Sequence, residues 1–312
     1  MESVVERSER PAAAHRNRNQ RADQASGLRA QVLDSLDGQT SRVKASRTKI
    51  IAVTSGKGGV GKTNVVANLA ASLSELGKKV VVLDADFGLA NIDVLLGLTP
   101  RFHLGHVLFG NKTLSEIMVQ GPHGIRIIPA SSGLQRLSEL TSEQRDHLVE
   151  SFALLDSDTD YFIIDTAAGI SRNVIHFLLA AHEVIVVSAP EPTAIVDAYA
   201  VIKIILAEDP SKIIHVLINS VQRETEAREV FAQINSVVNR FLNCEISYLG
   251  HIERDSHVLQ AVRSQVLVTH LYPQAPASKC FRSLACAVAQ QERVAPIADG
   301  LIWEKLLNDW VN

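Results

Sequence analysis

A glycine-rich stretch that ends in a lysine and a threonine has the residue types and spacing best suited to chemistry. Residues 56–63 fit the pattern G-x-x-x-x-G-K-[ST]. Glycines there let several backbone N–H groups converge on phosphate oxygens, at backbone angles that side chains disfavour. Lys62 would reach the β- and γ-phosphates of a nucleotide, and the Thr63 hydroxyl would bind Mg²⁺. We expect the nucleotide to contact Gly56, Lys57, Gly58, Gly59, Val60, Gly61, Lys62, Thr63 and Asn64.

The same glycines also fit the G-x-G-x-x-G pattern of dinucleotide-binding folds. Gly56, Gly58 and Gly61 supply the pattern, and Asp84 ends the next apolar run, as an acidic residue does in that fold. The lysine and threonine after Gly61 decide between the two. A dinucleotide site needs neither of them in the first turn of its helix, whereas a triphosphate bound with Mg²⁺ needs both. The sequence therefore predicts a triphosphate site, with a purely structural loop as the remaining alternative.

Carboxylates follow two further apolar runs. Asp84 and Asp86 come directly after residues 80–83, and Asp165 comes directly after residues 161–164. A single aspartate in such a place is more often a turn or helix-cap residue. Three of them, after two strands of one P-loop sheet, indicate a metal and phosphate site. We predict Thr63, Asp84 and Asp165 as the Mg²⁺ site, with Asp165 acting through water as a Walker B carboxylate.

The chain around these residues alternates short apolar, β-branched runs with helical patterns. This alternation is typical of a mostly parallel twisted sheet with helices on both faces, so we predict an α/β P-loop fold with about seven to eight strands. Ligands of such sheets bind beyond the carboxyl ends of the strands. The predicted strands are residues 50–54, 80–83, 125–128, 161–164, 184–188, 213–218 and 246–249, and the predicted packing helices are residues 193–207, 225–241 and 277–290.

Asn219 directly follows the predicted strand 213–218. Its side-chain amide could donate to and accept from an adenine base. The alternative is an ordinary turn, in which the amide bonds to its own backbone. We predict the adenine contact and keep the turn as its alternative.

Composition limits the other classes of function. The chain has 312 residues, 46% of them hydrophobic and 21% charged, which predicts one large domain over residues 49–290 with two appendages. A net charge of -3 gives no indication of a polyanionic partner, and no apolar run is long enough to span a membrane. With no apolar signal region at the N-terminus, we expect a cytoplasmic protein. The three cysteines show no C-x-x-C spacing, so we expect reduced, structural thiols. The eleven histidines show no metal-binding spacing.

Residues 1–48 have few large apolar side chains and predict a mostly disordered arm. Within it, residues 23–36 carry Leu28, Val32 and Leu36 at helical spacing, which indicates a short helix that folds against a partner. Clustered arginines in the arm would suit nucleic acid or a transit peptide, but the acidic residues among them argue against both.

Residues 291–312 predict a C-terminal amphipathic helix. Its apolar side includes Trp303 and Trp310, which would suit a membrane interface. Its polar side carries Glu304 and Asp309 against Lys305, and anionic lipid would repel the two acidic side chains. We therefore expect packing on the domain or on a protein partner, with membrane contact as the alternative.

Taken together, these residues resemble a known family. Lys57 matches the extra lysine in the deviant Walker A loop of MinD/ParA-type ATPases. Within that group the chain is most similar to the flagellar-number regulators of the FlhG family, also called FleN or YlxH. The resemblance covers about residues 49–267 and is carried by residues 84–93, 165–171, 190–193 and 197–199. Outside the ATPase core, residues 23–29 match the D-Q-A-x-x-L-R arm of that family.

The resemblance implies an ATPase that uses Mg²⁺ and switches between monomer and dimer. Two nucleotides would lie between the two copies, with Lys57 reaching the partner's phosphates and Asp86 orienting the attacking water. Gln24, with Leu28 and Arg29, would stimulate the GTPase of an FlhF-type partner. The core would restrain flagellar number, in some members by inhibiting a transcription activator, and flagellar switch-complex proteins are further expected partners. The resemblance also implies that this cytoplasmic protein could associate peripherally with the inner membrane or the cell pole.

Two departures from the family and three other functions follow from the same residues. The family's C-terminal helix is usually basic, whereas this one is acidic, and Ala167 stands where many relatives have glycine. A ParA-like partitioning ATPase on DNA would need a basic patch, yet the C-terminal half has no run of lysine or arginine. An iron-sulfur scaffold on this fold would need bridging cysteines, which are missing. A regulator that binds ATP and uses hydrolysis only as a timer stays open.

Overall fold

The computed structural model describes residues 48–86, 91–108, 112–129 and 141–291. The chain divides into residues 1–44 and residues 45–312, and all described residues belong to the second unit. The predicted arm helix, with Gln24, Leu28 and Arg29, lies outside the described residues, as do residues 292–312 of the C-terminal helix predicted over 291–312. Among the residues that are described, no helix is both long and apolar enough to cross a lipid bilayer.

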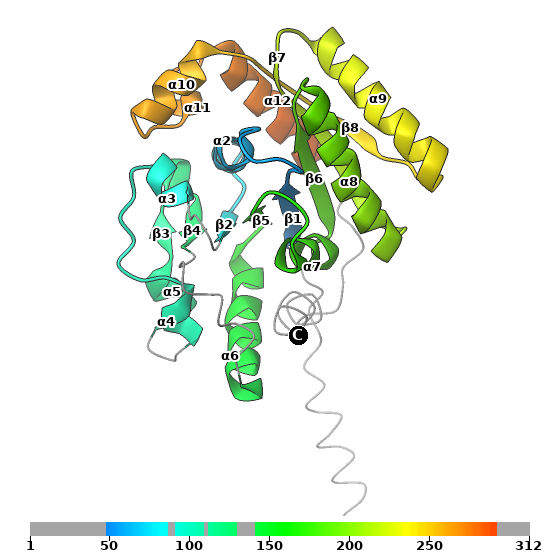
Figure 1. Cartoon of the computed structure of the whole chain (residues 1–312). Coiled ribbons are helices and arrows are strands. Elements are labelled where there is room, and N and C mark those ends of the chain that lie inside the picture. Colours follow the sequence, from blue (N-terminus) through cyan, green and yellow to red (C-terminus); the bar gives the residue numbers. More distant parts are fainter. Residues whose placement is uncertain (1–47, 87–90, 109–111, 130–140, 292–312) are drawn as a thin grey trace, which may run out of the picture. The chain divides into compact units, whose positions relative to one another are not determined.

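Within the described residues, one sheet of eight strands forms the centre, which confirms the predicted fold class (Figure 1). The strand order is β3-β4-β2-β5-β1-β6-β7-β8, and every neighbouring pair is parallel except β3 with β4. The strands are β1 (Lys49–Thr54), β2 (Val80–Ala85), β3 (Val119–Gln120), β4 (Arg126–Ile128), β5 (Tyr161–Thr166), β6 (Glu183–Ser188), β7 (Ile213–Val221) and β8 (Ser247–Glu253).

Each predicted strand is present, but three features differ from the prediction. The predicted strand 213–218 continues to Val221 as β7, so Asn219 lies within the strand and not after it. Strand β3 was not predicted because two residues are too few to show an alternating pattern. The predicted strand 246–249 continues to Glu253 as β8. The last three residues of β8 include His251 and Glu253, and these polar side chains interrupt the apolar pattern that marks a buried strand.

Helices cover both faces of the sheet. Residues of β1 alternate between the two layers, with Ile50 and Ala52 in one apolar cluster and Ile51 and Val53 in the other. The first cluster is closed by α4 (Leu104–Leu108), α5 (Leu114–Ile117), α6 (Ser142–Ala153), α7 (Arg172–Ala180), α8 (Pro192–Glu208) and α9 (Glu224–Leu242). The second is closed by α2 (Lys62–Glu75), α3 (Ile92–Leu95), α10 (Ser256–Arg263), α11 (Val268–Leu271) and α12 (Pro276–Gln290).

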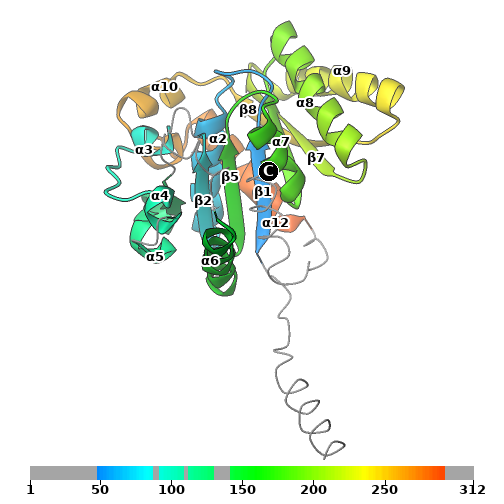
Figure 2. The same ribbon diagram turned by 60° about the horizontal axis from the view of Figure 1, so that its bottom comes forward.

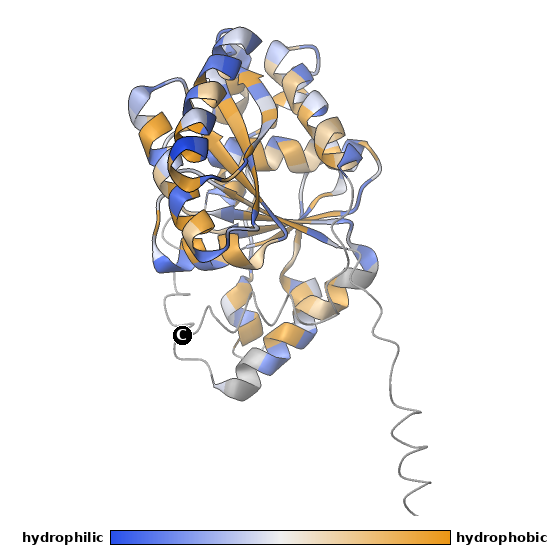
Figure 3. Cartoon of the chain, turned by 90° about the vertical axis from the view of Figure 1, so that its right-hand side faces the viewer, coloured by the Kyte–Doolittle hydropathy of each residue, from blue (hydrophilic) through white to orange (hydrophobic). Residues whose placement is uncertain are grey.

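The pictures show this layering directly. Helices α2 and α12 contact each other on one side of the sheet and lie side by side in two views (Figures 1 and 2). Apolar residues follow the strands and the inward helix faces, while the outward helix faces are mostly hydrophilic (Figure 3). The three predicted packing helices correspond to α8, α9 and α12, with ends within two residues of the prediction.

Strand register brings the predicted site residues to one edge of the sheet. Asp84 on β2 lies opposite Asp165 on β5, and Asp165 lies opposite Val53 on β1. The loop that follows β1 therefore begins beside both aspartates. Because all three strands are parallel, their carboxyl ends share this edge, as the sequence predicted.

Candidate phosphate-binding site

The loop between β1 and α2 has the backbone that a phosphate cradle requires. Gly59 and Gly61 have φ angles of +83° and +87°, in the left-handed region that favours glycine, and Gly61 is the N-cap of α2. Gly56 is constrained differently, because an added Cβ would lie 2.2 Å from the backbone carbonyl of Asp197 on α8. The glycines thus allow a tight loop at the N-terminus of a 14-residue helix, where backbone N–H groups and the helix dipole favour an anion.

Lys62, the first residue of α2, forms an ion pair with Asp165 at the end of β5. Both side chains are buried, with exposed fractions of 7% and 1%. Burial raises the pKa of Asp165, and the charge and hydrogen bond of Lys62 oppose that rise. The other carboxylate oxygen, Asp165 Oδ2, is buried and has no hydrogen-bond partner among the described residues. Such an oxygen is costly without a ligand, so the pair is incomplete as it stands.

Asp84 is the second buried carboxyl group at this edge. Burial and the nearby Asp165 charge raise its pKa from 3.8 to about 7. The backbone N–H of Asp86 donates to Oδ1 at 3.2 Å, and those of Asn91 and Ile92 donate to Oδ2 at 3.1 and 3.2 Å. These hydrogen bonds lower the pKa but do not offset the other two causes. Two carboxyl groups pressed together in this way favour a bound cation.

The residues predicted for Mg²⁺ are brought together. The Thr63 hydroxyl is close enough to Asp165 to lower its pKa, and the Asp86 charge is close enough to raise it. Asp84 and Asp165 are direct neighbours across β2 and β5. Oxygen donors with an orphaned carboxylate oxygen suit Mg²⁺, so Thr63, Asp84 and Asp165 fit the ion. Asp86 lies near Asp165 at the carboxyl ends of the strands, which is where an attacking water beside a γ-phosphate would lie.

Lys57 lies on the other side of the loop and is bound within its own chain. Its Nζ is 2.9 Å from Glu191 Oε2 and 3.1 Å from the Thr193 hydroxyl, both at the start of α8. The Lys57 and Glu191 side chains are 41% and 63% exposed. An ion pair this exposed contributes little to stability, so it can open at low cost.

Comparisons with known proteins agree with this geometry. A family model described as an AAA domain (AAA_31) matches residues 48–230. The antiactivator FleN of Pseudomonas aeruginosa is 44% identical over 76% of this chain and 85% of its own length. The flagellum site-determining protein YlxH of Helicobacter pylori is 40% identical over 72% of this chain and 76% of its own length. The chain belongs to the FlhG/FleN family of MinD/ParA-type ATPases.

Solved structures extend the same conclusion to the fold and the nucleotide. The MinD of Aquifex aeolicus, in its complex with MinC, aligns with a TM-score of 0.65 at 25% identity, covering 80% of this chain and all of that one. The MinD of Pyrococcus horikoshii, solved with Mg-ADP, aligns with a TM-score of 0.64 at 25% identity, covering 78% of this chain and 96% of that one. This FlhG/FleN family chain is an ATPase that uses ATP and Mg²⁺.

Asn219 contacts the loop of this FlhG/FleN family ATPase. Its Nδ2 donates to the Val60 carbonyl at 2.7 Å, and its Oδ1 accepts from the Ser220 N–H at 2.9 Å. A Cβ on Gly61 would lie 2.5 Å from the same Nδ2. The side chain therefore supports the loop from within strand β7, and its bond to the adjacent N–H is not the turn that the sequence offered as the alternative, because that turn bonds the N–H two residues on. The adenine contact stays a prediction.

A cavity of about 750 Å³ opens beside the loop and includes residues that the sequence did not indicate. It is lined by Lys57, Asn64 and Asn219, whose contacts with a nucleotide stay a prediction. The opposite wall is formed by residues 252–262, at the end of β8 and the start of α10. Ligands of parallel sheets bind beyond the carboxyl ends of the strands, so the end of β8 would have indicated this wall. The predicted strand stopped at residue 249, however, and so placed that end too early.

The turn after β5 is tied to the same loop. Its Gly169 N–H donates to the Ser55 carbonyl at 2.8 Å, and Gly169 has a φ of +96°. The Thr166 hydroxyl donates to the Val53 carbonyl at 3.1 Å. Since Asp165 precedes this turn, a shift of the loop around a phosphate would be passed directly to residues 166–169. Ala167, the departure from the family pattern, packs at the edge of the first apolar cluster.

Proposed function

We propose that this chain is an ATP-driven dimerisation switch that regulates flagellar number and placement by acting on an FlhF-type GTPase. The proposal rests chiefly on the similarity to FleN and YlxH over most of the chain, together with Lys57 in the loop. One relative is named an antiactivator and the other a flagellum site-determining protein, so a transcription activator and flagellar switch-complex proteins are further proposed partners.

The chain's own residues divide the work of hydrolysis. The amides of residues 56–61 would hold the phosphates, and Lys62 would leave Asp165 to bind the β- and γ-phosphates. Thr63, Asp84 and Asp165 would hold Mg²⁺, which when bound neutralises charge on the phosphate oxygens. Asp86 would orient the attacking water and accept its proton. Release of Lys62 from its carboxylate partner links nucleotide binding to the turn after β5.

Lys57 is the residue that would turn nucleotide binding into dimerisation. For it to reach the phosphates of a second copy, it must leave Glu191 and Thr193. The exposed pair opens at little cost, and a triphosphate on the partner offers a stronger set of acceptors. The same lysine thus has one acceptor set in the monomer and another in the proposed dimer.

Dimerisation is tested by light scattering during size exclusion with ATP and Mg²⁺. Asp86→Ala is expected to bind ATP, hydrolyse it poorly and persist as a dimer, because the water is no longer oriented. Lys57→Ala is expected to bind ATP and remain monomeric. Lys79→Ala is the matched control, since Lys79 pairs with Asp158 at the opposite end of the sheet. A monomeric Asp86→Ala variant with bound ATP would show that the dimer model is wrong.

The arm is tested by GTPase stimulation. Gln24→Ala should leave ATP hydrolysis intact and remove the stimulation of an FlhF-type GTPase, while Gln20→Ala, in the same arm, should retain it. Equal stimulation by the Gln24→Ala variant and the unmodified chain would refute the role of the arm. Flagellar number and placement in a deletion strain, complemented with each variant, then tests the biological role.

A further inference from the structure

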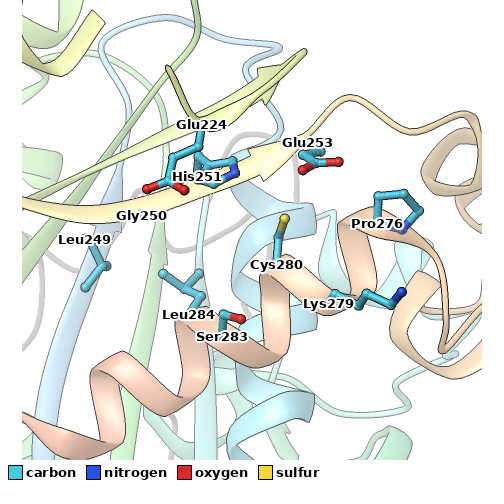
Figure 4. A pocket seen from close by; sticks show the side chains of 10 residues that line it. All are labelled: Glu224, Leu249, Gly250, His251, Glu253, Pro276, Lys279, Cys280, Ser283 and Leu284. Carbon is cyan, nitrogen blue, oxygen red and sulfur yellow. The ribbon is translucent and has the colours of Figure 1, made fainter. Parts of the chain in front are cut away.

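A second cavity, of about 500 Å³, lies between β8 and α12. Figure 4 shows its side chains, most of which come from the strand on one side and helix α12 on the other, with Glu224 from the start of α9. Leu249 and Leu284 continue the apolar core into one end of it. At the other end the wall is polar, with His251 and Glu253 on β8 and Cys280 on α12. His251 and Glu253 flank Ile252, which packs in the apolar cluster that α12 closes, so the polar side chains lie beside that core on the last strand of the sheet.

The three polar side chains converge. His251 and Glu253 are two residues apart on a strand and therefore point to the same face. One ligand atom from each of His251, Glu253 and Cys280 lies within 4.8 Å of the other two, and all three residues are half-buried. In a zinc centre the sulfur lies about 2.3 Å and the nitrogen about 2.0 to 2.1 Å from the metal, so the ligand atoms have to approach one another by at most about 1.5 Å. Small side-chain rotations in an open cavity supply a movement of that size.

We propose that His251, Glu253 and Cys280 bind one zinc ion. Imidazole, thiolate and carboxylate together suit Zn²⁺, whereas Mg²⁺ and Ca²⁺ prefer oxygen ligands alone. Binding releases the Cys280 thiol proton to solvent, and the resulting thiolate and the Glu253 carboxylate together balance the charge of the ion. Water or Glu224, which lines the same cavity, completes a four-coordinate site.

Tyr248 orients the histidine ligand. Its hydroxyl lies 3.3 Å from His251 Nδ1. In metal centres the ring nitrogen that does not bind the metal usually donates to a nearby acceptor, which fixes the tautomer and the ring orientation. In the proposed site Nδ1–H would donate to the Tyr248 oxygen, which would leave Nε2 to bind the metal. Tyr248 is therefore a positioning residue of the proposed site.

Glu253 also borders the nucleotide cavity, so the two sites must be separated in the experiment. The full-length chain is stripped with a chelator and then saturated with Mg²⁺ and ADP, which keeps the carboxylates near Lys62 occupied. Zinc is titrated in competition with a chromophoric chelator. Cobalt is titrated separately, because a thiolate ligand gives a charge-transfer absorption band that carboxylates and imidazoles lack. The expected result is one zinc ion per chain and a thiolate band with cobalt.

Variants then assign the ligands. Cys280→Ser and His251→Gln should each weaken zinc binding by on the order of 100-fold, and Cys280→Ser should also remove the cobalt band. Tyr248→Phe should weaken it about 10-fold, because it orients a ligand without touching the metal. Cys286→Ser is the matched control, since Cys286 is exposed on the same helix, and it should bind zinc as the unmodified chain does.

Three outcomes would overturn the proposal. These are no saturable zinc binding by the unmodified chain, unchanged affinity in the Cys280→Ser variant, or a cobalt band that disappears with Cys286→Ser instead. Thermal unfolding without metal shows whether each variant folds. Should Cys280→Ser fail to fold, the unmodified chain with and without zinc decides, because a ligand that binds only the folded state raises the unfolding temperature.

Discussion

Two buried lysine–carboxylate clusters lie at opposite ends of the same sheet, and they differ in how completely their hydrogen bonds are satisfied. At the carboxyl ends of the strands, Lys62 pairs with Asp165, but Asp165 Oδ2 has no partner among the described residues and Asp84 has a raised pKa. At the amino ends, Lys49 Nζ lies 2.7 Å from Glu183 Oε1 and donates to Gln291 at the end of α12 at 3.2 Å.

The cluster at the amino ends is the complete one. Glu183 Oε2 lies 3.3 Å from His215 Nε2, and His215 Nδ1 lies 2.7 Å from the Ser247 hydroxyl. Burial opposes ionisation of Glu183, yet the hydrogen bonds and charges of His215 and Lys49 more than offset it and hold its pKa below the usual value. The satisfied cluster joins β1, β6, β7 and β8, whereas the unsatisfied one is prepared for a ligand. Similar residue types thus serve structure at one end and binding at the other.

The largest expected difference between the clusters is in ATP binding. Lys62→Met should weaken ATP binding by at least about 100-fold, because charge-assisted bonds to two phosphates are lost. Lys49→Met, the matched change at the other end, should leave ATP affinity unchanged. Titration with a fluorescent ATP analogue measures both. Normal affinity in the Lys62→Met variant would show that the site assignment is wrong.

The free energy of unfolding should depend on Lys49, which ATP binding does not need. Lys49→Met leaves Glu183 buried without its cation, which should lower the free energy of unfolding by about 3 to 5 kcal/mol. Urea unfolding at pH 7 measures the change. Lys49→Met combined with Glu183→Leu removes both charges and should recover much of the loss. A single variant as stable as the unmodified chain would mean that the cluster is not a stabilising one.

The pH dependence of stability should have opposite signs at the two ends. The pKa of Asp84 is raised from 3.8 to about 7, so its stabilising contribution is present below about pH 4 and is lost as the pH rises through 7. In the chain without Mg²⁺ and nucleotide, Asp84→Asn should remove this loss, which amounts to up to about 4 kcal/mol. Urea unfolding from pH 5 to 8 should show the variant gaining on the unmodified chain as pH rises.

Glu183 provides the opposite sign within the same experiment. Its pKa is lowered, so its contribution is present above the usual glutamate pKa and is lost as pH falls through the lower folded value. Glu183→Gln should therefore be less stable than the unmodified chain at pH 7, with the gap closing in acid. Parallel pH profiles for Asp84→Asn and Glu183→Gln would contradict the contrast between the clusters.

The smallest expected effect is at Asn219, which touches the phosphate loop only from outside. Asn219→Ala removes the hydrogen bond to the Val60 carbonyl, worth about 1 kcal/mol, so ATP affinity should fall about fivefold. Asn239→Ala, on the exposed side of α9, is the control. A loss beyond about 30-fold would favour a direct contact between Asn219 and the base over support of the loop.

The sequence by itself determined the phosphate loop, seven of the eight strands and the edge of the sheet where the site lies. These features are readable because a buried parallel strand is a continuous apolar run and a phosphate loop is a local pattern of glycines. The short β3 and the ends of β7 and β8 were missed, since two residues carry no pattern and polar side chains such as Asn219, His251 and Glu253 interrupt one. Local sequence therefore gave the framework and its ligand-binding edge.

Only the tertiary structure decided which side chains meet. Lys62 and Asp165 are 103 residues apart in the sequence, and Asn219 is 159 residues from Val60. Cys280 reaches His251 and Glu253 because α12 packs on β8, and no spacing along the chain records that contact. The physical reason is that the causes of a pKa shift, which are loss of water, nearby charges and hydrogen bonds, come from groups that are neighbours in space and not in sequence. The charge state of Asp84, the completeness of each cluster and the proposed zinc site all depend on packing.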